Sequence, residues 1–241
     1  VVTYPITGSA RCLTVGDLDG NGSLDLATGN TVVNSGAVNV FFNDGEGAFS
    51  DSREVGSSRF TKCITNFDAD GDSIVDLLPI TGSGYGDVVV LRGLGEGKFD
   101  TQLVVPTGDF SNRSLESVDI DGDEHLDLIT VRTSDGQVLV LPGNGDATFD
   151  TPVASPLGTN TNDFVTGFID GDALLDGVSA HGTPGRVGIA LGSEGGTFQS
   201  PTFIELGQRV AGVAIGDFDR DGATDVAAVP SPTNGITILL G

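Results

Sequence analysis

A nine-residue acidic pattern recurs along the chain at a nearly constant interval, and this repetition constrains the fold more than any other feature. Four copies are complete: DLDGNGSLD (17–25), DADGDSIVD (68–76), DIDGDEHLD (119–127) and DFDRDGATD (217–225). A fifth copy, FIDGDALLD (168–176), lacks only the first acid, and successive copies begin 51, 51, 49 and 49 residues apart. Asp, Asn and Gly are common in solvated turns. Such turns have no reason to return at this interval, so the chain consists of five copies of one structural unit.

Each copy predicts four short β-strands. An apolar segment precedes the acidic loop (12–15, 63–65, 114–118, 164–167 and 213–216), and a second segment follows it. The third is an apolar run typical of a strand buried on both faces: VNVFF, VVVLR, VLVLP, VGIAL or ITILL. In the first four copies a glycine-rich turn then leads to a phenylalanine that begins the fourth strand: Phe49, Phe99, Phe149 and Phe198.

Four strands in about 50 residues are typical of one blade of a β-propeller. We therefore predict an all-β fold, a five-bladed β-propeller of four-stranded blades that forms a single domain over residues 1–241. The chain ends after a third strand, ITILLG, and begins with VVTYPITG, which matches a fourth strand. We expect this N-terminal strand to complete the last blade and close the ring.

A chain that begins at Val1 and contains no Met is also expected to be a processed or excised one.

The charge of the chain is negative and locally concentrated. The net charge of −23 argues against a nucleic-acid partner, because nucleic acids are bound through Lys and Arg. Eighteen of the 34 acidic residues are aspartates of the five loops. We interpret this clustering mainly as the signature of bound metal, with halophily or an acidic solvated surface as the weaker explanation. No apolar run reaches the ~20 residues that a membrane-spanning helix needs.

The spacing of the acids predicts calcium sites. Calcium takes six to eight oxygen ligands, which loops supply from odd-numbered positions together with one backbone carbonyl. An all-oxygen set argues against zinc, and a flexible loop suits calcium better than magnesium. The EF-hand is excluded because its Glu at position 12 and flanking helices are missing. The expected ligands are Asp17, Asp19, Asn21, Ser23 and Asp25; Asp68, Asp70, Asp72, Ile74 and Asp76; Asp119, Asp121, Asp123, His125 and Asp127; and Asp217, Asp219, Asp221, Ala223 and Asp225.

Within this set Ser23, Ile74, His125 and Ala223 would contribute their backbone carbonyls. Phe168 replaces the first acid of the loop at 168–176, so a weak or empty site is expected there. The prediction is therefore about four calcium ions per chain.

The acidic loops, together with the turns of the form GEGxF or GDxTF, resemble the FG-GAP/VCBS repeats of integrin-α-like β-propellers. The resemblance covers all five copies. It implies that each loop joins the first and second strands of a blade and binds calcium. Propellers of this family more often have seven blades, whereas this chain has five repeats. A calcium-dependent fold of this kind is expected to be secreted, because free calcium is high outside cells.

The two cysteines, Cys12 and Cys63, occupy the same position in neighbouring repeats. A disulfide needs Cα atoms within about 7 Å of each other. Inner strands of adjacent blades often lie further apart, so two small buried thiols are the favoured interpretation and a disulfide is the alternative.

The resemblance implies a non-enzymatic binding module, and we expect a carbohydrate-binding, lectin-like one whose partner is a glycan or glycoprotein. A polar and partly aromatic pocket is the speculative ligand site, formed by Arg11, Phe60, Lys62, Phe110 and Arg113. The alternative, which we favour for the cations, is that they balance neighbouring carboxylates.

Two other classes of function stay open, namely a protein–protein or adhesion module and, less expected, a polysaccharide-acting enzyme. No catalytic residue is predicted, because neither His125 nor His181 lies in a recognisable nucleophile or metalloprotease motif.

Overall fold

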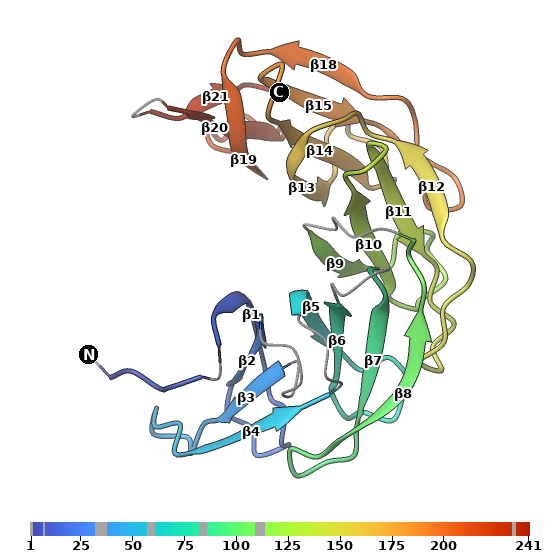
Figure 1. Ribbon diagram of the computed structural model, residues 1–241. Helices are drawn as coiled ribbons and strands as arrows, with labels where there is room; N and C mark the ends of the chain where they lie inside the picture. The colour runs from blue at the N-terminus through green and yellow to red at the C-terminus, as the bar shows by residue number, and fades with distance from the viewer. Residues whose placement is uncertain are drawn as a thin grey trace. The chain divides into compact units, whose positions relative to one another are not determined.

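The computed structural model of the protein describes residues 2–6, 8–31, 38–56, 61–81, 86–108, 114–232 and 235–241. Within these ranges the chain forms β-strands and turns but no helix, so the all-β prediction is confirmed (Figure 1). It follows that the described residues contain no helix long and apolar enough to cross a membrane.

The strands form antiparallel sheets in which successive strands are neighbours. The first sheet contains β1 (Ala10–Gly16), β2 (Asp25–Asn30), β3 (Val38–Phe42) and β4 (Asp51–Val55). The second contains β5 (Thr61–Phe67), β6 (Asp76–Thr81), β7 (Val88–Gly93) and β8 (Phe99–Val105). The third contains β9 (Leu115–Val118), β10 (Asp127–Arg132), β11 (Gln137–Leu141) and β12 (Val153–Pro156).

The remaining strands form one sheet of four strands, one of three and a short ribbon. The fourth sheet contains β13 (Thr161–Gly167), β14 (Asp176–His181), β15 (Arg186–Ala190) and β18 (Thr202–Glu205). Between β15 and β18, β16 (Gly192–Ser193) pairs with β17 (Thr197–Phe198). The last sheet contains β19 (Arg209–Gly216), β20 (Asp225–Ser231) and β21 (Thr237–Leu239). The predicted repeat of four strands is thus present in the first four sheets.

The acidic loops join the first and second strands of the sheets, as the repeat predicts. In the first sheet, Gly16 at the end of β1 lies opposite Asp25 at the start of β2. The same register pairs Phe67 with Asp76, Gly167 with Asp176, and Gly216 with Asp225. The ninth position of the pattern is therefore the first residue of the second strand, and the strand ladder holds the two ends of the loop together.

The described chain divides into two compact units, residues 1–117 with 143–150 and residues 118–142 with 151–241. In the first unit every residue of β3 is buried, and Val40 belongs to a core that also contains Leu77 and Val89. In the second unit Phe164 packs edge to face against Phe198, with ring centroids 5.9 Å apart. The third strands β3, β7 and β11 are mostly buried, as expected of strands buried on both faces. The third strand of the last sheet, β21, differs from this expectation, because Ile238 is exposed.

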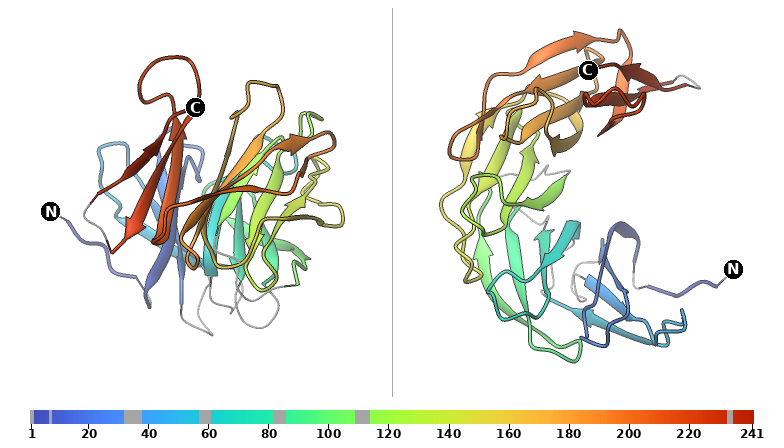
Figure 2. Two further views of the ribbon diagram at one scale, coloured as in Figure 1. Left: turned by 90° about the horizontal axis from the view of Figure 1, so that it is seen from above. Right: turned by 180° about the vertical axis from the view of Figure 1, so that it is seen from behind.

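The predicted closure of the ring by the N-terminal strand is not confirmed by the described residues. Residues 2–6 form no strand, and the last sheet, drawn in red, has three strands within the described residues (Figure 2). Tyr4 instead packs against Phe41 and Phe49 of the first repeat, and its hydroxyl accepts a 3.2 Å hydrogen bond from the Phe49 N–H. Tyr4 thus packs on side chains of the first repeat, one of them 45 residues away in the sequence, and the described residues include no fourth strand of the last sheet.

Candidate metal centres

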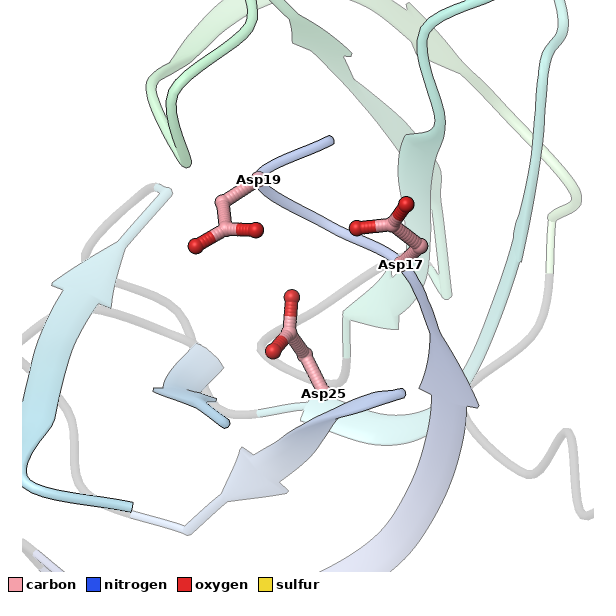
Figure 3. Close-up of side chains that lie close together, drawn as sticks. All are labelled: Asp17, Asp19 and Asp25. Atoms are coloured by element: carbon pink, nitrogen blue, oxygen red, sulfur yellow. The ribbon is translucent and has the colours of Figure 1, made fainter. Parts of the chain in front are cut away.

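Four of the five acidic loops gather three carboxylates each. The groups are Asp17, Asp19 and Asp25; Asp68, Asp70 and Asp76; Asp119, Asp121 and Asp127; and Asp217, Asp219 and Asp225. In every group one oxygen from each residue lies within 4.8 Å of the others. Figure 3 shows the first group, in which the three carboxylates point toward a common space between the end of β1 and the start of β2. A set of carboxylate oxygens in a loop fits a hard cation such as calcium.

The first carboxylate of each of these loops is held by backbone hydrogen bonds. In the first loop, Asp17 accepts N–H groups from Gly20 and Gly22, both at 2.9 Å. The equivalent bonds reach Asp68, Asp119 and Asp217. These are local side-chain-to-backbone bonds of the kind that Asp forms in turns. They position the acid before any metal binds.

The fourth residue of each loop requires a left-handed backbone. Gly20, Gly71, Gly122 and Gly171 have φ values between 75° and 84°, a conformation that glycine adopts without steric cost. The last loop has Arg220 at this position with φ of 68°, which is a strained conformation for a residue with a Cβ atom. The glycine of the acidic pattern is therefore explained by the left-handed backbone conformation at this position, which glycine adopts without strain.

The ninth acid has a structural role that sequence reasoning missed. Asp25 is fully buried and accepts two backbone N–H groups, from Leu18 at 2.8 Å and from Asn43 at 2.7 Å. Asp76, Asp176 and Asp225 repeat this arrangement with one donor in the loop and one at the end of the third strand. The ninth acid thus ties the acidic loop to the third strand. Its presence in the fourth loop, where the first acid is lost, is the signal in the sequence that could have revealed this role.

Burial and crowding of charge change the acidity of the ninth acids. Burial raises the pKa of Asp25, and the nearby charges of Asp19 and Asp17 raise it further, while the two N–H donors act in the opposite direction. Burial likewise raises the pKa of Asp76. The pKa of Asp225 is lowered, mainly by the N–H groups of Gly241 and Phe218. In the first loop a cation would relieve the part of this shift that comes from the charges of Asp19 and Asp17.

The predicted ligands at positions 5 and 7 lie in the same loops, and the aspartates at position 5 are not among the three carboxylates of each group. Asp123, for example, accepts the backbone N–H of His125 at 2.8 Å, and Asn21 accepts that of Ser23 at 2.7 Å. Asp72 and Asp221 accept the N–H groups of Ile74 and Ala223 in the same way.

The fourth loop forms no such group within the described residues. Phe168, in place of the first acid, is exposed, while Asp176 still accepts the N–H groups of Ile169 and Gly192. The loop therefore keeps its structural hydrogen bonds without gathering three carboxylates.

The second loop contains a cation that the sequence pattern does not predict. The Nε atom of Arg92, at the end of β7, lies 2.5 Å from Oδ2 of Asp70. Its Nη2 atom lies 3.4 Å from Oδ2 of Asp72. Two of the expected metal ligands in this loop thus form ion pairs with a side chain of the protein.

The speculative ligand pocket is described only in part. Arg11 is exposed on β1 and Lys62 is half-buried on β5, while Phe60, Phe110 and Arg113 lie outside the described residues. Cys12 and Cys63 are half-buried and form no disulfide, in agreement with the favoured interpretation. Burial, with a further contribution from Cys12, raises the pKa of Cys63 to about 12. Burial also raises the pKa of Cys12, so neither thiol ionises readily.

His181 is a packed core residue on β14. Its Nδ1 atom lies 3.0 Å from the Thr159 carbonyl oxygen and its Nε2 atom lies 2.9 Å from Ser179 Oγ. The ring packs edge to face on Phe203, over which the Arg186 guanidinium stacks at 3.5 Å. Since a carbonyl oxygen only accepts, Nδ1 carries the proton of the neutral ring and Ser179 donates to Nε2. Burial, followed by the charge of Arg186, lowers the pKa of His181, although the bond to Thr159 opposes this.

Comparison with models of protein families shows which family the sequence resembles. A family model described as FG-GAP-like repeat matches residues 68–130 and 169–228, together just over half of the chain. The matched ranges contain the second, third and last acidic loops and nearly all of the fourth. A comparison with curated protein sequences gives no match.

Several solved structures of β-propeller-type proteins share the fold. A lectin of Agrocybe aegerita that recognises non-reducing terminal N-acetylglucosamine matches with a TM-score of 0.58 and 20% identity, over 89% of this chain and 59% of the lectin chain. BBS1N in complex with ARL6DN matches with a TM-score of 0.61 and 14% identity, over 92% of this chain and 60% of that chain. The Tc holotoxin pore of Photorhabdus luminescens matches with a TM-score of 0.50 and 17% identity, over all of this chain and 11% of that chain. This chain therefore spans about three-fifths of the first two, and at these identities the likeness concerns the fold alone.

Proposed function

The chain belongs to the FG-GAP-like repeat family, and on that premise we propose that it is a calcium-stabilised binding module that recognises carbohydrate. The observation that carries the calcium part is the gathering of three aspartate oxygens within 4.8 Å of one another in four equivalent loops. Two carboxylates about 4 Å apart repel by roughly 4 kcal/mol at an effective dielectric constant near 20. A divalent cation offsets this repulsion and fits an all-oxygen set of ligands.

The calcium ions act on stability in this proposal. Each ion links the first residue of an acidic loop to the start of the second strand, for example Asp119 to Asp127. Residues at positions 5 and 7, such as Asp123 and the carbonyl of His125, complete the coordination. A calcium requirement suits a secreted protein, and we propose an extracellular location on that ground.

We also propose that the chain forms a closed five-bladed ring, with the N-terminal segment as the fourth strand of the last blade. The support is that β4, β8, β12 and β18 complete the first four sheets, whereas β21 has no such neighbour within the described residues. A cysteine pair at Thr3 and Thr237 tests the closure. Oxidation to an intramolecular disulfide in the monomer, seen by mass spectrometry, would support the ring. Failure of every pair placed along residues 2–6 and 237–239 would refute it.

Carbohydrate is the proposed ligand, and the support is the likeness in fold to a lectin that recognises N-acetylglucosamine. Arg11 and Lys62, with Phe60, Phe110 and Arg113, are the proposed contacts. The protein would act by binding alone, without catalysis. A protein-binding or adhesion module is the second candidate, because BBS1N, which shares the fold, is found in complex with ARL6DN.

A glycan array probed with the calcium-loaded and the chelated protein tests the carbohydrate proposal. We expect binding to glycans with terminal N-acetylglucosamine or a related sugar in calcium, and its loss in chelator. A Lys62→Ala variant should weaken binding, whereas Lys98→Ala, an exposed residue paired with Glu96 outside the proposed site, should leave it unchanged. No binding to any glycan, together with capture of a defined protein partner, would favour the adhesion module instead.

A further inference from the structure

Arg92 lies among the carboxylates of the second acidic loop. Its Nε atom is 2.5 Å from Asp70, and its Nη2 atom is 3.4 Å from Asp72. Asp70 also belongs to the group of three carboxylates with Asp68 and Asp76. The side chain of Asp70 is only 11% exposed and that of Arg92 is 38% exposed, so the ion pair lies at the edge of the loop.

The backbone fixes where the Arg92 side chain begins. The next residue, Gly93, donates its N–H to Oδ1 of Asp76 at 2.7 Å, which anchors the end of β7 to the acidic loop. A guanidinium stays protonated in proteins, so the charge of Arg92 does not depend on these pairs. A permanent positive charge is therefore held beside the expected metal ligands.

No other repeat with this anchor has a cation at the same place. The equivalent N–H donors to the ninth acid are Asn43, Gly192 and Gly241. The residues that precede these donors are Phe42, Leu191 and Leu240, all of them apolar. The third repeat has Pro142 at the corresponding position of the sequence. Arg92 is thus a feature of the second loop and not of the repeat.

We propose that Arg92 is the resident cation of the second loop, and that this loop stays free of calcium at concentrations that saturate the first, third and last loops. This inference rests on the proposed calcium function. Arg92 pairs with Oδ2, one of the two oxygens that Asp70 can offer to a metal. A guanidinium and a calcium ion also repel each other at ligand distance. The Asp–Arg ion pairs offset the repulsion among the carboxylates in place of a metal.

The number of bound ions tests the inference directly. Calcium bound per chain is measured by equilibrium dialysis and by native mass spectrometry for the wild type, Arg92→Leu and Arg132→Leu. Leu is the residue that the fourth and fifth repeats have at this position. Arg132 pairs with Asp135, outside every acidic loop, and controls for the loss of a positive charge. We expect about three ions in the wild type and in Arg132→Leu, and about four in Arg92→Leu.

A second substitution shows whether the additional calcium ion binds in the second loop. Asp68→Asn removes the first ligand of the second loop. It should leave the ion count of the wild type unchanged and lower that of Arg92→Leu by one. If Arg92→Leu does not fold, Asp68→Asn in the wild-type background still decides the question.

Three outcomes contradict the proposals in different ways. About four ions in the wild type, or the loss of an ion from wild-type protein on Asp68→Asn, would overturn the role of Arg92 and leave the calcium function standing. Binding of no calcium by any folded variant would instead refute the calcium function itself.

Discussion

The backbone N–H of Gly192 donates a 2.8 Å hydrogen bond to Oδ1 of Asp176, sixteen residues earlier in the chain. Oδ2 of the same carboxylate accepts the N–H of Ile169 at 2.7 Å. This pair lies in the acidic loop that has Phe168 in place of its first acid. The ninth acid therefore keeps its two backbone partners where the loop does not gather a set of metal ligands, which separates its structural role from metal binding.

Replacement of Asp176 by Asn should destabilise the protein in the presence of a chelator. An amide has one acceptor oxygen, so its NH₂ group would face the N–H of Gly192 or those of Ile169 and Asp170. The lost charge-assisted bond and the unsatisfied donor should cost about 1–3 kcal/mol of unfolding free energy. Urea denaturation in EDTA measures this. Asp172→Asn is the matched control, because an amide oxygen can still accept the Leu174 N–H. An equal effect of both substitutions would contradict a special role for the ninth acid.

Calcium should raise the thermal stability of the chelated protein. An ion at about 100 times its dissociation constant stabilises the folded state by about 2.7 kcal/mol per site. Asp119→Asn should lower the number of bound ions by one and reduce the rise in melting temperature. Asp170→Asn, in the loop without a group of three carboxylates, should change neither quantity. A melting temperature that does not respond to calcium would show that the loops are held by their hydrogen bonds alone.

Replacement of Gly122 by Ala should destabilise the chelated protein by about 1–2 kcal/mol, because its φ of 83° is unfavourable for a residue with a Cβ atom. A Cβ atom added there meets nothing within 4 Å, so the cost is purely conformational. Gly235→Ala is the control, since a Cβ atom meets nothing there either and the backbone is not left-handed. Its effect should stay within about 0.5 kcal/mol. Equal denaturation midpoints for the two variants would argue against strain at Gly122.

Unfolding free energy should fall in the chelated protein as the pH is lowered through the ordinary pKa of histidine, about 6.5. The pKa of His181 is lowered in the folded state, so the unfolded chain takes up a proton that the folded protein does not. The stability that comes from the neutral ring is complete above the unfolded pKa and declines below it. One such group contributes a slope of at most about 1.4 kcal/mol per pH unit.

The contribution of His181 to the pH dependence of the unfolding free energy is measured by comparing variants. His181→Gln should flatten the dependence between pH 7.5 and 5, whatever its effect on absolute stability. His125→Gln, at an exposed residue, is the control for the loss of a histidine. Asp25 and Asp76, whose pKa values are raised, contribute in the opposite sense, and their contribution is common to all three proteins. An unchanged slope in His181→Gln would exclude this histidine as its source.

The sequence by itself determined the repeat, the strands and the place of the acidic loops. The apolar segments specify strands locally. The hydrogen bonds that Asp17 accepts from the N–H groups of Gly20 and Gly22 also span only a few residues. The same pattern therefore produces the same loop wherever it occurs. The gathering of the first, third and ninth acids follows from this local geometry and from the strand register, which places Asp25 opposite Gly16.

Only the tertiary structure decided which distant groups meet these acids. Asp25 accepts a hydrogen bond from the Asn43 N–H, and Arg92 forms an ion pair with Asp70. Both interactions depend on how the third strand packs beside the acidic loop. Tyr4 resembles a residue of a fourth strand in the sequence, yet it packs on Phe41 and Phe49. The physical reason is that local pattern fixes a backbone conformation, whereas a side chain far along the chain finds its partner only through packing.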